Sequence, residues 1–230
     1  GERPRARDRE RRHCAEAPVV QALRPMPGRS LAHRDGVAVS VELRARAALL
    51  EALVGDGRLR VLRGFGGWSR LWVTVLDNKD SDLGAHQEVA IGIPVVCSPS
   101  GALPFLARIV GSRHPRAGRL ILFSAVSSER AREVAVGVHG VPTLLAEIGV
   151  ESHDGRVACT LVSDGAELLR LVVRKGTRYR LRRDRTALYS PRDGASARAM
   201  IETQALVTDR RGHGCAEVVP GAGRFADLLR

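Results

Sequence analysis

Lysine and aromatic residues are scarce in this sequence of 230 residues. Only Lys79 and Lys175 are lysines among 37 basic residues, a usage typical of a GC-rich genome. Aromatic residues make up 3% of the chain, which leaves few rings on which the bases of a single strand could stack. No helix-turn-helix or RNA-binding signature is present either. We therefore expect no nucleic-acid partner, and a role as a basic nucleic-acid adaptor would rest on the net charge of +12 alone.

Long apolar runs and closely spaced cysteines are also missing. No apolar stretch is long enough to cross a bilayer, and the charged N-terminus lacks the apolar segment of a signal peptide. A cytoplasmic protein without a membrane partner is the expectation. The cysteines show neither a CxxC pair nor zinc-ligand spacing with histidine, so we expect reduced, mostly buried thiols and neither a metal nor a cofactor at these positions: Cys14, Cys97, Cys159 and Cys215.

The positive charge is concentrated in two places, residues 1–35 and residues 170–185. The second stretch, "LLRLVVRKGTRYRLRR" at 168–183, has alternating polarity and predicts a hairpin with Lys175 and Gly176 at its tip. Leu169, Tyr179 and Leu181 would then share one face. The opposite face would be either a solvated surface or a docking surface for an acidic partner, and it would carry Arg170, Arg174, Arg178, Arg180 and Arg182.

The rest of the chain predicts a mainly β domain. Residues 1–17 form a basic extension with almost no apolar residues and are expected to be disordered, whereas residues 18–230 are expected to form a single domain. Short alternating segments outnumber helical ones, and helices are predicted at 44–54, 128–138 and 223–230. Strands are predicted from 36 onward, including one at 103–111. The fold class is therefore α+β, with a curled or closed, largely antiparallel sheet and a few packed helices.

Four stretches, taken in order, resemble the acetoacetate decarboxylase-like family. The resemblance covers about residues 36–230 and implies that family's cone-shaped β-barrel and a symmetric homo-oligomer. The matching stretches are "VSVELRARAALLEAL" from 39, "LWVTVLDNKDSDLGAHQEVAIGIPV" from 71, "LILFSAVSSERAREVAVGVHGVPTLLAEI" from 120 and "AEVVPGAGRFADLLR" from 216. The third resembles a strand, a Gly-Arg-Glu helix and a Gly-aromatic-Pro-Lys turn, and the fourth resembles a His-Pro-x-x-Asp-x-Leu ending.

The sequence departs from this family at its chemical centre. In the family, the lysine after the turn proline forms a Schiff base with a β-keto acid, and a neighbouring lysine lowers its pKa. Here the two positions are Thr143 and Leu144, and neither can form an imine. The family's Tyr-x-Glu is His86-Gln87-Glu88, and Trp72 or Val73 replaces its first glutamate. Classical decarboxylation is therefore not expected, although a relocated lysine such as Lys79 remains an alternative.

Six residues are candidates to converge on an interior cavity if the fold holds. Glu88 and Arg44 are the candidate catalytic residues. Arg44 falls on the arginine of the family's early strand–helix, and a carboxylate such as Glu88 in an apolar strand is costly to bury without a role or a partner. The candidate substrate-binding residues are Thr143, Trp72, His139 and His86. Each also has a structural alternative: Arg44 as the partner of Glu88, Thr143 as an ordinary residue at a strand start, and both histidines as core residues.

Two functions follow from this set. The first is an enzyme without imine chemistry, acting on a polyketide-like keto or enol compound by cyclisation, dehydration or a related lyase or isomerase step. Glu88 would move protons and Arg44 would hold a carboxylate or enolate, in bacterial specialised metabolism. The second is a small-molecule binding protein that has kept the scaffold and lost the nucleophile.

Overall fold

The structure is a computed structural model, and it describes residues 16–19, 31–55, 57–98, 114–192, 195–210 and 215–221. Three predicted features lie wholly or mostly outside these residues: the extension at 1–17, the strand at 103–111 and the helix at 223–230. Among the described residues, none of the helices is long and apolar enough to cross a membrane.

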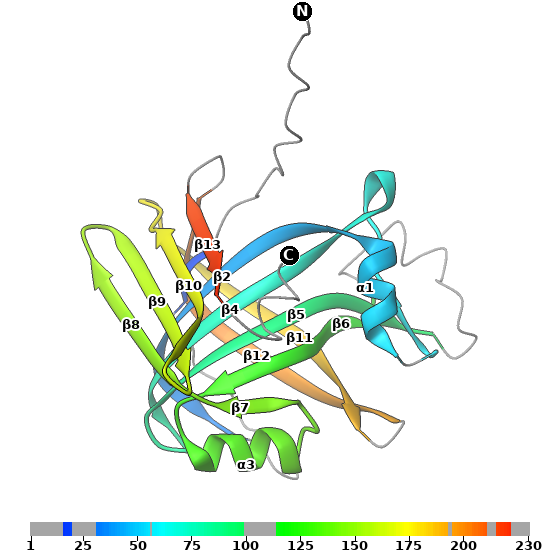
Figure 1. Ribbon diagram of the computed structural model, residues 1–230. Coiled ribbons are helices and arrows are strands. Elements are labelled where there is room, and N and C mark those ends of the chain that lie inside the picture. The colour runs from blue at the N-terminus through cyan, green and yellow to red at the C-terminus, as the bar shows by residue number, and fades with distance from the viewer. Residues whose placement is uncertain are drawn as a thin grey trace, which may run out of the picture.

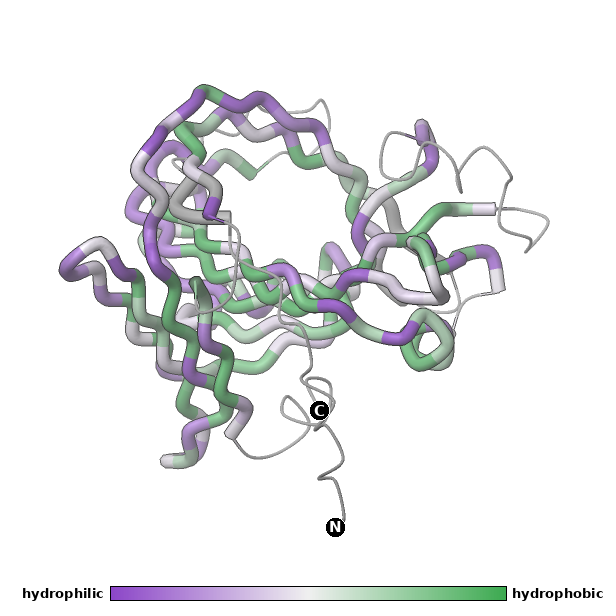
Figure 2. The backbone as a smooth tube through the Cα atoms, turned by 90° about the horizontal axis from the view of Figure 1, so that it is seen from above, coloured by the Kyte–Doolittle hydropathy of each residue, from purple (hydrophilic) through white to green (hydrophobic). Residues whose placement is uncertain are grey.

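The larger sheet has nine strands and curls round on itself. Its order is β3-β5-β4-β2-β1-β12-β11-β6-β7, and β6 also pairs with β5. Hydrogen-bonded neighbours can therefore be followed from β5 through β4, β2, β1, β12, β11 and β6 back to β5, and Figure 2 shows this ring of strands from above. The strands are β1 (Glu16–Val19), β2 (His33–Arg46), β3 (Leu59–Val61), β4 (Trp68–Ser81), β5 (His86–Cys97), β6 (Ala117–Val126), β7 (Thr143–Leu145), β11 (Arg180–Arg192) and β12 (Ala195–Asp209).

The ring is largely antiparallel, as predicted. Two parallel pairings depart from this, β6 with β11 and β6 with β7. The first joins Ala187 of β11 to Gly118 of β6 and completes the ring. The second places the short strand β7 beside β6, after the chain has passed through a helix (Figure 1).

The smaller sheet is an antiparallel meander in the order β13-β10-β9-β8. Its strands are β8 (Glu147–His153), β9 (Arg156–Ser163), β10 (Ala166–Arg174) and β13 (Ala216–Pro220). Both of its tight turns are Asp-Gly pairs with positive φ, at Asp154-Gly155 and Asp164-Gly165. Positive φ at both central residues is what a two-residue hairpin turn of this kind requires, so local sequence sets these connections.

Two α-helices are found among the described residues, and both begin and end on recognisable signals. Helix α1 (Ala47–Val54) follows β2 directly and ends at Gly55, whose φ of 64° is the left-handed conformation that glycine adopts readily. Helix α3 (Glu129–Gly137) begins at Ser128, whose Oγ accepts a hydrogen bond from the backbone N–H of Ala131. The predicted helices at 44–54 and 128–138 are thus confirmed, with the first beginning later than expected.

The two faces of β2, β4 and β5 have different surroundings. Odd-numbered residues such as Val41, Val73 and Ile91 are buried in a core shared with the smaller sheet and α1. The smaller sheet lies outside the ring in Figure 2, so the even-numbered residues of these strands face its inside. We call this side, from Ser40 and Glu42 of β2 to Glu88 of β5, the inner face. On this side Glu42, Trp72 and Glu88 are half-buried, whereas Ala90 and Pro94 are buried.

The predicted hairpin at 168–183 is wrong. β10 pairs with β9 and β13 in the smaller sheet, whereas β11 pairs with β12 and β6 in the ring. Leu169 is buried as expected, but Tyr179 and Leu181 are 56% and 58% exposed. The five arginines of the predicted docking surface therefore do not share one hairpin face. Arg170 forms an ion pair with Glu167, and Arg182 forms one with Asp184.

The cysteines also differ in part from expectation. Cys97 and Cys159 are free thiols, and burial raises the pKa of Cys159 to about 12, so this thiol stays protonated. Cys215 is disulfide-bonded, and the prediction of a reduced thiol is wrong at this position. Cys14 lies outside the described residues.

Candidate functional site

Glu88 lies on the inner face near the start of β5. Its neighbours across the sheet are Leu76 of β4 and Val126 of β6. Its Oε1 accepts a hydrogen bond of 3.0 Å from the hydroxyl of Ser124, which is itself buried. The side chain keeps some contact with solvent, yet desolvation by the surrounding protein is the largest influence on its pKa and raises it. The Ser124 hydrogen bond opposes this rise, because it stabilises the carboxylate.

The turn before β7 lies across strand β6 from Glu88. Thr143 pairs with Ser124 in the parallel β6–β7 ladder, and the backbone N–H of Ser124 donates to the carbonyl of Pro142. Ser124 therefore connects Glu88 with Thr143. The hydroxyl of Thr143 donates to the carbonyl of Val141 at 2.9 Å, which leaves its oxygen as an acceptor. The predicted neighbourhood of Glu88 and Thr143 is present, and the donor role proposed for Thr143 would need this local hydrogen bond to break.

His86 lies in the β4–β5 turn region and is fully engaged. Its Nδ1 lies 2.9 Å from the carbonyl of Gly84, and its Nε2 lies 3.2 Å from Nδ2 of Asn78. Because a carbonyl only accepts, Nδ1 carries the proton and Nε2 accepts from the amide. His86 is 2% exposed, so its position is that of a core histidine that holds the turn two residues before Glu88.

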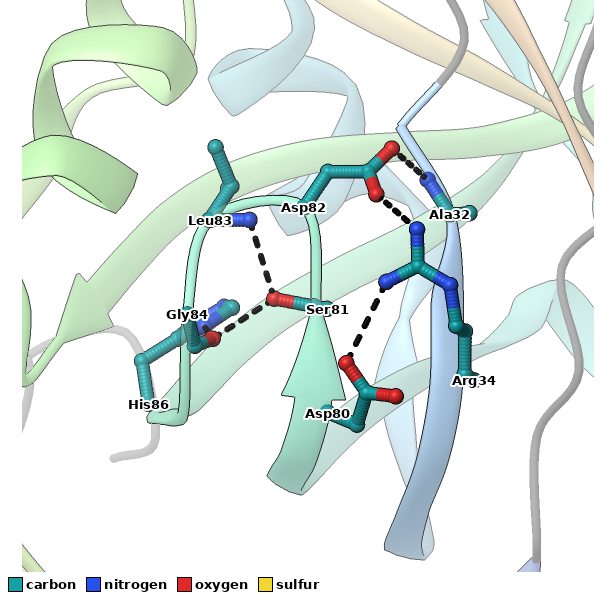
Figure 3. A network of polar contacts seen from close by, with 8 residues as sticks. All are labelled: Ala32, Arg34, Asp80, Ser81, Asp82, Leu83, Gly84 and His86. Carbon is teal, nitrogen blue, oxygen red and sulfur yellow. Dashed lines mark hydrogen bonds and ion pairs between the residues drawn. The ribbon is translucent and has the colours of Figure 1, made fainter.

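The turn itself is fixed by hydrogen bonds on its other side (Figure 3). The hydroxyl of Ser81 donates to the carbonyl of Gly84 at 2.6 Å and accepts from the N–H of Leu83. Asp82 accepts from the N–H of Ala32 at 3.0 Å and pairs with Arg34 of β2. These contacts join β2 to the turn and so fix the start of β5, where Glu88 lies.

Trp72 lies on the inner face, farther along β4. It pairs with Gly92 of β5, four residues from Glu88, which corresponds to about 13 Å along the strand. Its Nε1 donates to Glu42 at 3.3 Å, and the guanidinium of Arg119 lies 4.4 Å from its ring centroid. Trp72 thus shares a face with Glu88 but does not contact it.

Arg44 is not brought to Glu88. It pairs with Arg70 on β4, six residues from Leu76, the partner of Glu88, so about 20 Å of strand separates the two sites. Its side chain is exposed, and its guanidinium lies 5.1 Å from the ring centroid of Trp68. The alternative in which Arg44 neutralises Glu88 is therefore excluded by the strand register.

His139 follows α3 and is half-buried, four residues before Thr143. Burial lowers its pKa, which favours the neutral imidazole. Its backbone N–H donates to the carbonyl of Val134, and this bond continues the end of the helix. Among the described residues, no group of three histidine, cysteine or acidic side chains could hold a metal ion.

Both lysines lie away from Glu88. Lys79 forms an ion pair of 2.7 Å with Asp77, and Asp77 also accepts from Gln87, the residue before Glu88. Because successive side chains of a strand point to opposite faces, this cluster lies on the side of β5 opposite Glu88. Lys175 lies after β10 and donates to Ser152 of the smaller sheet.

Comparison with known proteins identifies the architecture. The similar structures include the enduracididine biosynthesis enzyme MppR, complexed with the condensation product of pyruvate and imidazole 4-carboxaldehyde. It is 10% identical with a TM-score of 0.51, and the match covers 95% of this chain and 79% of that one. The fold is acetoacetate decarboxylase-like.

Two further similar structures are an acetoacetate decarboxylase-like enzyme from Sphingomonas wittichii RW1 and the acetoacetate decarboxylase from Legionella pneumophila. The first is 16% identical with a TM-score of 0.46, covering 94% of this chain and 81% of that one. The second is 10% identical with a TM-score of 0.47, covering 96% and 93%. No family model matches the sequence, and no curated protein matched it either.

Sequence reasoning missed Ser124, Glu42 and Arg119. Ser124 interrupts the apolar strand "LILFSAV". A lone hydroxyl in a buried strand needs a hydrogen-bond partner, so the sequence did contain a signal for this residue. Glu42 and Arg119 gave no such signal, because their contacts to Trp72 depend on strand register. Both contacts are formed across neighbouring or next-neighbouring strands of the ring.

Proposed function

We propose that this protein is an enzyme that performs acid–base chemistry on a keto or enol compound without forming an imine, with Glu88 as the proton-transfer group. The observation that carries the proposal is the hydrogen bond from Ser124 to a half-buried Glu88 whose pKa is raised, with the turn that holds Thr143 in place of an amine on the other edge of β6. A carboxyl group with a raised pKa is better matched to proton transfer near neutral pH than an ordinary one.

The simplest step is proton abstraction next to a carbonyl. The Glu88 carboxylate takes a proton from the carbon beside the ketone, the C–H electron pair forms the enolate double bond, and the carbonyl electrons move to oxygen. The protonated Glu88 then returns the proton to the same carbon, which gives hydrogen exchange, to another carbon of a conjugated enolate, which gives isomerisation, or to a leaving hydroxyl, which gives dehydration. Ser124 is the positioning residue, because its hydroxyl fixes the carboxylate orientation.

A cyclisation or dehydration of a polyketide-like compound, in bacterial specialised metabolism, is the finer form of this proposal. Its support is the likeness in fold to MppR, which is described in complex with the condensation product of pyruvate and imidazole 4-carboxaldehyde. Aldol-type condensation and dehydration both proceed through an enol or enolate, the species that Glu88 would form. The substrate-binding roles of Thr143, Trp72, His139 and His86 and the catalytic role of Arg44 remain predictions.

Hydrogen exchange tests the proposal without knowledge of the natural substrate. The protein is incubated with pyruvate or acetoacetate in D2O, and loss of the proton signals next to the ketone is followed by NMR. We expect catalysed exchange that Glu88→Gln reduces at least tenfold. Glu151→Gln, at an exposed position of β8, is the matched control and should leave the rate unchanged. Equal rates in wild type and Glu88→Gln would refute the role of Glu88.

Borohydride trapping tests the absence of an imine in the same samples. Intact mass should show no reduced adduct with either keto acid, whereas a lysine-bearing relative serves as the positive control. An adduct mapped to Lys79 or Lys175 would refute the proposal and would support a decarboxylase with a relocated lysine. The ion pair of Lys79 with Asp77, on the far side of β5, argues against that alternative.

A non-catalytic binding protein is the second candidate. It is favoured by Thr143, whose hydroxyl is engaged with Val141 and so offers no donor to an enolate oxygen. Binding of a keto acid without any exchange would support it. The symmetric homo-oligomer also remains a prediction, and light scattering at several protein concentrations tests it.

A further inference from the structure

We propose that strand β8 pairs with β8 of a second copy of this chain, so that the smaller sheet continues across a two-fold axis. The inference goes beyond the proposed chemistry and does not depend on it. It names the surface through which two copies associate and the register in which their strands meet.

The first support is the contrast between β8 and the other edge strands. The two sheets end at β3 and β7 in the ring and at β13 and β8 in the smaller sheet. β3 and β7 have three residues each, and β13 has five and ends at Pro220. Short edge strands and edge prolines prevent pairing with other chains. β8 has seven residues without proline or lysine, and Figure 1 shows it at the outer side of the molecule.

The second support is the direction of the backbone groups of β8. The two-residue turn Asp154-Gly155 joins His153 to Arg156, the closing pair of the β8–β9 hairpin. In such a hairpin the closing pair exchanges hydrogen bonds, and bonded and non-bonded pairs then alternate along the ladder. The N–H and carbonyl groups that point away from β9 therefore belong to Ile148, Val150 and Ser152. Within the described residues, none of these groups bonds to another part of the backbone.

A two-fold axis at Val150 uses all of these outward groups. It places Val150 opposite Val150 of the second copy and Ile148 opposite Ser152, and each of these pairs exchanges two backbone hydrogen bonds. Ile148 and Val150 are half-buried and pack against the core. Pairing in this register therefore extends the apolar layer across the axis.

The third support is the charge on the opposite face of β8. The same axis places Glu147 of one copy opposite His153 of the other, and Arg156, the partner of His153 on β9, adds a permanent positive charge on that face. Glu147 and Arg156 are exposed, and within the described part of the chain neither forms an ion pair. Glu151 lies opposite Gly149, which carries no charge. Opposite charges therefore meet on both sides of the axis.

The two glutamates of β8 also oppose the neighbouring registers. Moving the axis by one residue toward the start of β8 places Glu147 opposite Glu151. Moving it by one residue toward the end places Glu151 opposite Glu151 of the second copy. Like charges directly opposite each other destabilise a strand pair, so the charges favour the same register as the backbone groups.

Sedimentation velocity of the full chain over a range of concentrations tests this interface. We expect a monomer–dimer equilibrium that Val150→Pro weakens at least tenfold, because proline lacks the N–H that bonds across the axis. This N–H points away from β9, so the variant keeps the hydrogen bonds of the β8–β9 ladder. Val150→Thr keeps both the N–H and the β-branched shape, and as the matched control it should dimerise like the wild type.

Charge variants keep the test decisive if Val150→Pro does not fold. Glu147→Lys and His153→Glu, both at exposed positions, should each weaken dimerisation about threefold or more at low ionic strength. The double variant restores opposite charges and should dimerise more tightly than either single variant. A chain that stays monomeric at all concentrations would overturn the inference. So would a dimer that Val150→Pro and both charge variants leave unchanged, because it would form through another surface.

Discussion

Gly118 of β6 lies at the point where the ring closes, and we predict that Gly118→Ala destabilises the protein. An ideal Cβ at this residue would lie 2.3 Å from the carbonyl oxygen of Ala187, 2.6 Å from Cε2 of Tyr189 and 2.9 Å from Cβ of Ala187. None of these atoms is the end of a flexible chain, so β6 and β11 would have to separate. Overpacking of this kind costs about 1–3 kcal/mol.

A second cost comes from Tyr189. Its hydroxyl donates to the carbonyl of Arg116 at 2.9 Å, and a shift of the ring would lengthen this bond, at about 1 kcal/mol. The total is about 2–4 kcal/mol, and about 2–4 °C of Tm per kcal/mol in a domain of this size gives a fall of roughly 5–15 °C.

Thermal unfolding followed by circular dichroism, with urea unfolding alongside, measures this loss. Gly137→Ala is the matched control, because no atom lies within 4 Å of its ideal Cβ and alanine favours the helix. That variant should keep the wild-type Tm or exceed it slightly. A Gly118→Ala protein as stable as the wild type would refute the close approach of β6 to β11, and with it the closure of the ring.

Three further predictions concern stability. Because burial raises the pKa of Glu88 above 4.5, the folded state binds this proton more tightly than the unfolded state. The wild-type free energy of unfolding should thus decline as pH rises from 4.5 through the folded pKa, and urea titrations of Glu88→Gln should lack this component. Leu161→Ala, at a fully buried position between the sheets, should cost about 2–5 kcal/mol in the same assay. Ser128→Ala removes the N-terminal cap of α3 and should cost about 1 kcal/mol, seen as a small decrease in Tm.

Local patterns predicted the elements well and their partners poorly. The stretch at 156–163 alternates Val157, Cys159 and Leu161, and it forms β9 with those bounds. The stretch after Gly176 also alternates, and this made it look like the partner of β10. Alternation of apolar and polar residues indicates that a strand has one buried and one exposed face. It does not indicate which strand lies beside it. The partner of β10 on its second edge is β13, which begins more than 40 residues after β10 ends.

In the candidate site, too, individual residues could be predicted from the sequence, but their positions relative to one another could not. Glu88 could be chosen as a candidate because a carboxylate in an apolar strand is costly to bury without a partner or a role. The turn at Thr143 could be chosen because it resembles the turn of a known family. The separation of Arg44 from Glu88 was not predictable, because it depends on the register between β2, β4 and β5. Only a shift of six residues in the β2–β4 register would have placed Arg44 opposite Leu76, the partner of Glu88.

Side chains of β2, β4 and β5 point alternately to the core and to the inner face, so substitutions along these strands have two different kinds of effect. Replacing Val73 or Ile91 removes contacts that hold the two sheets together, whereas replacing Thr74 or Ala90 on the inner face changes what a ligand would meet. Along these strands, neighbouring residues therefore affect folding and ligand recognition alternately. Laboratory evolution of new substrate preferences can be confined to the half-buried even-numbered positions of these strands, such as Thr74 and Leu76, whereas buried even-numbered residues such as His86 and Asn78 are needed for the fold.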